Sequence, residues 1–327
     1  MPSWIGIHAW CKSNRSDAAE RAEQVLRRKE EYAKKYNNVQ IKPSDYTPVI
    51  SKWRDDPERA TLLFEEVIKR YGGKSDDRSR PDAAPLNALL DVYAKWKEKN
   101  LAYKAECCLR KMNRLYEEGS ICFSPDVISY RSVIDAWARS WTRESPQHVS
   151  ALVNEMIHKY QKEGRNDLRP DSNAFNLILK ACSTVSATWE GKDVKEKGDD
   201  HPIAIANRVF TMLKAENEFG AKVTHATYSY MFTIYKRHMD FRDKRHSSVM
   251  QNLWKHCCRD GMVSEFSLDT FRESVLEQDF WEGIGGKDNF ESIGKTDIDM
   301  ITVEDLPAQW RRGVLPLKRS DNRTDKT

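Results

Sequence analysis

Four basic residues occupy the same place in a repeated sequence pattern and could together bind a chain of phosphate groups. Each stands nine positions after the first residue of a helix-like pattern: Lys12, Lys95, Arg139 and Arg237. Asp55 and Thr184 hold this position in two other copies. A cation that returns once per unit on one helix can follow a phosphate backbone. Because helix ends also favour Lys and Arg through the helix dipole, ordinary helix-end charge is the alternative.

Other groups of reactive residues have the wrong spacing for chemistry. The sequence GGKS begins at Gly72, but Ile68 stands where a phosphate-binding loop needs its first glycine. His256 is next to Cys257 and Cys258, and neighbours on a helix point away from one another. No carboxylate pair and no nucleophile with a nearby base stands out. The sequence therefore predicts no enzyme activity, no metal site, no cofactor and no small-molecule substrate.

Composition narrows the choice of partner. The chain has 327 residues, of which 39% are hydrophobic and 32% charged, with a formal net charge of +4. No apolar run approaches the roughly 20 residues of a membrane-spanning helix. The weak net charge means that an anionic partner must be met by a local pattern of cations. The seven cysteines have no disulfide spacing, which indicates a reducing compartment.

One helical pattern returns along the chain. In SPDVISYRSVIDAWARS, Tyr130 is followed by apolar residues three, four and seven positions later, which form one face of a helix. We call the first residue of this pattern the anchor. Further anchors, some with weaker patterns, stand about 40 to 53 positions apart at Ser3, Tyr46, Leu86, Phe175, Tyr228 and Phe271.

A second periodic helix follows the first in most units. It is marked by a small residue with apolar residues three or four positions later, at Ala22, Ala60, Ala105, Val149, Ala206 and Val249. Two helices per unit predict an all-α fold, an α-solenoid (a right-handed superhelix) of antiparallel helical hairpins. The polar stretch 183–202 lengthens one unit and is expected to be a loop.

The phrase P-D-x-x-x-[YF]-x-x-[VIL]-[IL]-x-A-W resembles the pentatricopeptide repeat family, in a long-repeat variant. The resemblance covers roughly Met1 to Trp281. It rests on the aromatic anchor, the Ala-led second helix and three Pro-Asp pairs, Pro81/Asp82, Pro125/Asp126 and Pro170/Asp171. The last two units depart from it, with Val223/Thr224 and Phe266/Ser267 in place of Pro-Asp.

Members of that family bind single-stranded RNA, about one base per repeat. The resemblance implies that the residue after each anchor reads a base together with the last residue of its repeat. The implied pairs are Thr47 with Asp82, Asn87 with Asp126, Arg131 with Asp171, Asn176 with Thr224, and Ser229 with Ser267. The first two pairs should prefer G and then U, and the Asn176 pair a pyrimidine. Arg131 is not one of the usual small polar readers.

The tryptophans of the repeated pattern are expected in the core. Trp10, Trp53 and Trp137 share a helix face with isoleucines, so we expect core packing instead of base stacking. The array should span 1–282 with about six to seven repeats, the first and last incomplete. A partly disordered extension, 283–327, should follow, with the segment around Trp310 docked on the last repeat.

These observations predict sequence-selective binding of single-stranded RNA, in organellar RNA processing, stability or translation. The mitochondrion or plastid is implied by the family resemblance alone. Pro2 and Ser3 fall inside the expected first helix, so the first repeat is truncated or an upstream part is missing. The rival hypothesis is a protein-binding α-solenoid, such as a scaffold for an organellar ribosome or assembly partner. Some of the implied base-reading residues depart from the family pattern and the repeats are long, so the protein-binding hypothesis stays open.

Overall fold

The computed structural model describes residues 6–36, 39–72, 82–95, 100–185, 199, 201–240 and 244–314. Within these ranges the chain forms fifteen α-helices and no strand, which confirms the predicted all-helical class. The helices divide into two compact units, Met1–Pro170 and Asp171–Thr327. The expected anchor Ser3, most of the expected loop 183–202 and the tail after residue 314 lie outside the described residues.

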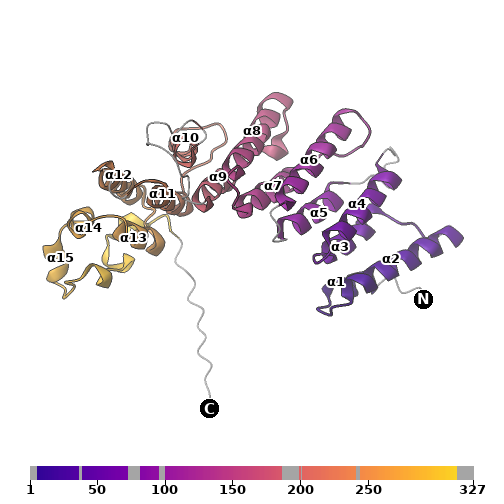
Figure 1. The fold of residues 1–327 in the computed structure, drawn as a ribbon, viewed down its shortest axis with the longest axis horizontal. Coiled ribbons are helices and arrows are strands. Elements are labelled where there is room, and N and C mark those ends of the chain that lie inside the picture. The colour runs from indigo at the N-terminus through magenta and orange to yellow at the C-terminus, as the bar shows by residue number, and fades with distance from the viewer. Residues whose placement is uncertain are drawn as a thin grey trace, which may run out of the picture. The chain divides into compact units, whose positions relative to one another are not determined.

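Unit 1 holds eight helices that follow one another in chain order (Figure 1). They are α1 (Gly6–Lys12), α2 (Ala18–Lys35), α3 (Pro43–Lys52), α4 (Pro57–Tyr71), α5 (Ala84–Lys95), α6 (Leu101–Glu117), α7 (Val127–Ser140) and α8 (Ser145–Glu163). Odd-numbered helices pack on one another, α1 on α3, α3 on α5 and α5 on α7. Each even-numbered helix packs on the odd-numbered helix before it. The result is a row of helical hairpins. In each hairpin we call the odd-numbered helix the first helix and the even-numbered helix the second helix.

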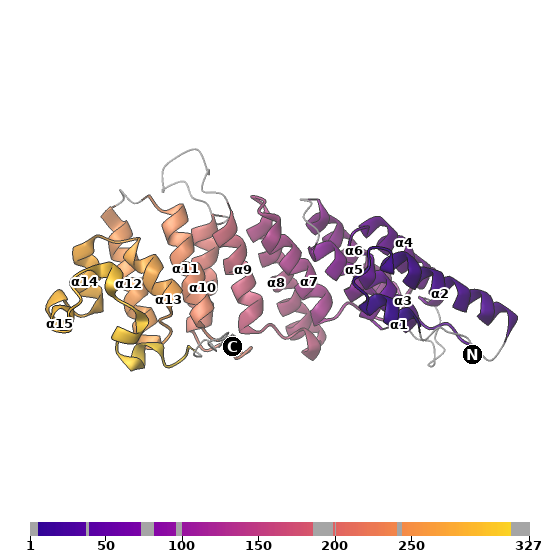
Figure 2. The same cartoon turned by 90° about the horizontal axis from the view of Figure 1, so that it is seen from below.

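Unit 2 continues the alternation (Figure 2). Its helices are α9 (Ser172–Thr184), α10 (Pro202–Lys214), α11 (His225–His238), α12 (Lys244–Asp260), α13 (Glu265–Arg272), α14 (Glu277–Ile284) and α15 (Lys287–Glu291). Helix α11 packs between α9 and α13, while α10 packs on α9 and α12 on α11. None of the described helices is long and apolar enough to cross a membrane.

The anchors explain why these segments pack. Each of the six anchors that the structure describes is at most 1% exposed: Tyr46, Leu86, Tyr130, Phe175, Tyr228 and Phe271. Burial of a large side chain at each anchor removes apolar surface from water and holds one hairpin on the next. Proline at the first turn of α3 and α4 starts those helices without losing a needed backbone donor.

Helix α13 begins three residues earlier than its expected anchor implies. Its N-cap is Ser264, whose hydroxyl accepts from the Ser267 N–H. Leu268 therefore stands four residues after the cap, as Tyr228 does after Thr224 in α11. Phe271 is still buried, one turn further on, and stacks on Trp254 with ring centroids 4.6 Å apart. The sequence pattern found the helix but misplaced its register.

The segment after α15 docks on α12. Trp310 meets the Trp254 ring edge to face at 6.4 Å, and its carbonyl accepts a 2.8 Å hydrogen bond from the Val263 N–H. Gly261 has φ of +75°, which favours glycine, and its carbonyl accepts from the Gly313 N–H at 2.9 Å. An aromatic residue thus fixes this segment to the α11/α12 hairpin, and not to the last repeat as expected.

Candidate functional site

The structure brings together the expected pair Asn87 and Asp126. Asn87 lies on α5 and Asp126 caps α7, and the Asn87 amide donates to both carboxylate oxygens at 3.1 and 3.2 Å. Asp126 also accepts a hydrogen bond from the Ser129 N–H and so caps the N-terminus of α7 as part of a capping box. The Ser129 hydroxyl in turn donates to the Asn87 amide oxygen at 2.5 Å.

Unit 2 repeats this arrangement with different residues. The Asn176 amide on α9 donates to the Thr224 hydroxyl at 3.1 Å, and Thr224 caps α11. The Thr227 hydroxyl donates back to the Asn176 amide oxygen at 2.7 Å. In each unit, an asparagine on one first helix thus forms hydrogen bonds with both the N-cap residue and the third residue of the next first helix.

The other three expected pairs are not joined in this way. The Thr47 hydroxyl donates to the Pro43 carbonyl, whereas Asp82 accepts from the Ala84 N–H. Arg131 is exposed in unit 1, and Asp171 caps α9 in unit 2.

Ser229 and Ser267 are the last expected pair. The Ser229 hydroxyl donates to the His225 carbonyl, and Ser267 is fully buried inside the first turn of α13. Because Ser264 is the cap there, it holds the position that Asp126, Asp171 and Thr224 hold in other helices.

The bridging hydroxyls of Ser129 and Thr227 did not emerge from the sequence analysis. Both lie three residues after a capping residue, at the third residue of the helix. A capping residue followed three positions later by Ser or Thr, with Asn after the preceding anchor, is the pattern that identifies them. Their hydrogen bonds occupy the Asn oxygen, so each Asn is fixed in orientation before any ligand arrives.

The four expected phosphate-binding cations lie at or near the ends of first helices, and three have partners. Lys95 pairs with Asp91 at 2.6 Å, and Arg139 with Asp135, each one helical turn back. Arg237 donates to the Ser183 carbonyl at 2.5 Å. Lys12 is exposed and makes no hydrogen bond or ion pair with the described part of the chain. The pairs on α5 and α7 are exposed, so they contribute little to stability and can exchange for a phosphate.

The three tryptophans differ in burial. Trp137 is 5% exposed, stacks on His148 with ring centroids 3.9 Å apart, and donates from Nε1 to Glu106 at 2.7 Å. This confirms the core prediction for Trp137. Trp10 and Trp53 are only half-buried, and the Trp53 Nε1 is shielded from solvent without a hydrogen-bond partner among the described residues.

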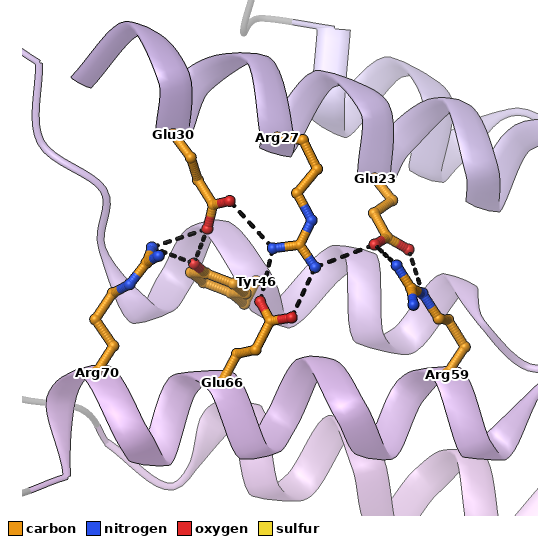
Figure 3. A network of polar contacts seen from close by, with 7 residues as sticks. All are labelled: Glu23, Arg27, Glu30, Tyr46, Arg59, Glu66 and Arg70. Atoms are coloured by element: carbon orange, nitrogen blue, oxygen red, sulfur yellow. Dashed lines mark hydrogen bonds and ion pairs between the residues drawn. The ribbon is translucent and has the colours of Figure 1, made fainter. Parts of the chain in front are cut away.

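A network of seven polar side chains ties α2 to α4 across α3 (Figure 3). Arg27 of α2 forms two hydrogen bonds with Glu66 of α4, at 2.6 and 2.9 Å. Glu23 of α2 accepts from Arg59 of α4 at 3.0 Å. Tyr46, the anchor of α3, completes the network with Glu30 and Arg70. Two paired guanidinium forks make this a specific join between neighbouring hairpins.

The anchor tyrosines of α7 and α11 have carboxylate partners too. The Tyr130 hydroxyl donates to Glu155 of α8 at 2.6 Å, and the Tyr228 hydroxyl to Asp260 of α12 at 2.5 Å. Lys214 of α10 also reaches Asp260 at 2.6 Å. Burial and the neighbouring carboxylate raise the pKa of the Tyr130 and Tyr228 hydroxyls above the ordinary value. A phenol held neutral in this way serves as a hydrogen-bond donor.

The pKa values of two carboxyl groups in these networks are shifted in the opposite direction, below their ordinary values. Burial alone would raise the pKa of Glu30, but hydrogen bonds from Tyr46 and Arg27 lower it below the ordinary value. For Asp260 the same balance, with Lys214 and Tyr228 as donors, gives a lowered pKa. Both groups are therefore charged and paired at neutral pH.

The described residues contain no cluster of three or more side chains of the kinds that hold a metal ion. No protein-family model matches the chain, and a search of curated proteins finds no match. The site is therefore defined by its own geometry: asparagine-bridged helix caps on the first helices, and polar networks that fix the second helices.

Proposed function

We propose that this protein is a pentatricopeptide-like α-solenoid that binds single-stranded RNA, with the caps of its first helices reading bases. The supporting observation is that two pairs implied by the family resemblance, Asn87 with Asp126 and Asn176 with Thr224, meet at equivalent places in the two units. The first pair holds an amide and a carboxylate and the second an amide and a hydroxyl, each in a fixed orientation, and such groups can distinguish donors from acceptors on an unstacked base. Organellar RNA processing, stability or translation is the setting that the resemblance implies.

Exposed cations would supply the affinity that does not depend on sequence. Among the described residues Lys12 is unpaired, and Lys95 and Arg139 each pair with a carboxylate one turn back on the same helix. A phosphate can replace a neighbouring carboxylate at small cost, because an exposed ion pair is worth about 1 kcal/mol or less. RNA would then follow one edge of the first helices.

Binding of random single-stranded RNA at several salt concentrations tests this assignment. The variant with Ala at Lys12, Lys95, Arg139 and Arg237 should bind more weakly. Its salt dependence should flatten by somewhat under one unit of slope for each phosphate that is no longer neutralised. A control variant should remove equal charge from second helices, at Arg21, Arg114, Lys162 and Arg208, all exposed. Equal weakening in both variants would show that the effect is general charge, and would contradict the proposal.

A protein-binding scaffold is the second candidate. The observation that favours it is that the amide groups of Asn87 and Asn176 are already bonded to neighbouring helices. If these bonds serve only to join hairpins, the same edge is free to accept a peptide or a partner subunit. Retention of every RNA-binding property in the quadruple variant above would favour this candidate.

A further inference from the structure

The groove between α4 and α6 is an apolar pocket of about 450 Å³. Its walls come from α4, α5 and α6 and include Phe64, Ile68, Leu89, Cys108, Met112 and Leu115. Pockets of about 300 to 1,000 Å³ with mostly apolar walls are typical of small-molecule sites. Its lining includes none of the cap pairs and none of the four expected phosphate-binding cations, so this inference does not depend on the proposed RNA binding.

This groove is apolar at positions where the preceding junction is polar. Between α2 and α4, Tyr46 meets Glu30 and Arg70 across the junction. In the next junction, Leu86 takes the anchor position, and Ile68 and Leu115 stand at the positions equivalent to Glu30 and Arg70. Three apolar side chains cannot reproduce those hydrogen bonds. The wall formed by Ile68 and Leu115 is therefore apolar at positions where the preceding junction is polar.

Polar groups around the pocket give it an excess of positive charge. Thr61 and Tyr93 satisfy each other through a 2.6 Å hydrogen bond between their hydroxyls. Lys111 lies 3.9 Å from Glu65, a loose and exposed ion pair. Lys69 has no hydrogen bond or ion pair with any residue that the structure describes. Two ammonium groups therefore face one carboxylate beside an apolar volume.

We propose that this pocket binds an amphipathic anion, a carboxylic acid of the fatty-acid class. Its alkyl chain would lie among Phe64, Ile68 and Met112, where burial of each CH₂ adds to the affinity. Its carboxylate would meet Lys69 and Lys111 at the rim. The charge on these two lysines favours an acid over a neutral lipid of the same length.

Calorimetric titration of dodecanoate into the full chain tests the proposal. We expect one molecule to bind per chain. Cys107→Trp, which places a large ring at the pocket wall, should weaken binding about tenfold or more. Ala151→Trp is the matched control, because Ala151 is exposed and occupies on α8 the position that Cys107 occupies on α6. It should leave dodecanoate affinity unchanged.

A second variant tests the contribution of the lysine charges to binding without changing the shape of the pocket, and it alters only exposed side chains. Lys69→Gln with Lys111→Gln should weaken dodecanoate binding and leave binding of neutral dodecanol unchanged. This variant decides the question even if Cys107→Trp fails to fold, which circular dichroism would reveal. Absence of dodecanoate binding, or equal weakening by Ala151→Trp, would overturn the proposal. The pocket would then be better explained as a contact surface for a protein.

Discussion

Two junctions of unit 1, where α2 meets α4 and where α6 meets α8, use equivalent sequence positions but differ in the hydrogen bonding of their tryptophans. Glu23 on α2 and Glu106 on α6 are equivalent, and each is followed four positions later by an arginine. Trp53 and Trp137 both stand seven residues after their anchors. The Trp137 Nε1 donates to Glu106 at 2.7 Å, whereas the Trp53 Nε1 has no partner within the described ranges of the chain.

The two junctions also differ at one position on the next second helix. At the α2/α4 junction, Arg59 donates to both oxygens of Glu23. At the α6/α8 junction the equivalent residue is His148, which contacts a single Glu106 oxygen at 2.7 Å and leaves capacity for the indole. Arg59 thus holds both oxygens of Glu23, whereas His148 and the Trp137 indole share one oxygen of Glu106 and Arg110 holds the other.

The largest expected difference between the junctions comes from removing the whole indole. Trp137→Ala should cost about 3 to 5 kcal/mol, because a buried ring that contacts two neighbouring helices is removed. Trp53→Ala should cost distinctly less, since Trp53 is half-buried and its Nε1 bonds to none of the described residues. Chemical unfolding of both variants measures this. Equal costs would show that the two indoles contribute equally to stability.

Removal of the shared carboxylate should be the next largest effect. Glu106→Ala leaves the Trp137 Nε1 buried without an acceptor and should cost about 2 kcal/mol. Glu106→Gln keeps an acceptor oxygen and should recover part of that loss. The comparison of the two thermal midpoints isolates the acceptor from the packing. If Glu106→Gln were as destabilising as Glu106→Ala, the negative charge would be the decisive property.

A smaller difference is expected when only the indole nitrogen is removed. Trp137→Phe should cost about 1 to 2 kcal/mol, because one hydrogen bond and some side-chain volume are removed. Trp53→Phe removes a donor that bonds to no described residue, so we expect a change within about 0.5 kcal/mol of zero. Equilibrium unfolding of this pair would sharpen the comparison. A large loss of stability in Trp53→Phe would mean that its nitrogen has a partner in solution.

The smallest expected effect is a response to acid at the tyrosine networks. The pKa of Glu30 is lowered in the folded chain, so its contribution to stability is present above the ordinary value of about 4.3 and is lost as the pH falls below it. Tyr46→Phe removes one stabilising donor and should make stability less sensitive to pH below about 4.3. Thermal unfolding across that range checks it. An unchanged slope would exclude the Tyr46 hydroxyl as a cause of the shift.

The period of apolar residues predicted the helices well. Burial of one helix face determines both the spacing of apolar residues in the sequence and the packing of the helix. Tyr130 and Phe175 illustrate this, since the spacing that follows each reflects the residues that it packs against. The cap pairs were accessible through the family resemblance. At α13, however, Ser264 and Ser267 are both able to cap, and local sequence did not decide between them.

The polar networks between second helices could not be predicted in the same way. Arg27 and Glu66 are 39 positions apart, and each belongs to a charged stretch with several possible partners. Only the packed hairpins decide which charges meet. The same applies to the α4/α6 pocket, whose walls depend on which side chains of α4, α5 and α6 meet.

Selection from a random pool of single-stranded RNA, with the wild-type chain and Asn87→Thr in parallel, tests the proposed function most directly. Asn87 with Asp126 should favour U after the G expected from Thr47 with Asp82. A threonine at position 87 still has a donor for the Asp126 carboxylate, so the variant should retain its cap while the preference moves from GU toward GG. The shift should be on the order of 1 kcal/mol if one hydrogen bond decides the base. No GU enrichment with the wild-type chain, or enrichment that the substitution leaves unchanged, would contradict base reading by these pairs.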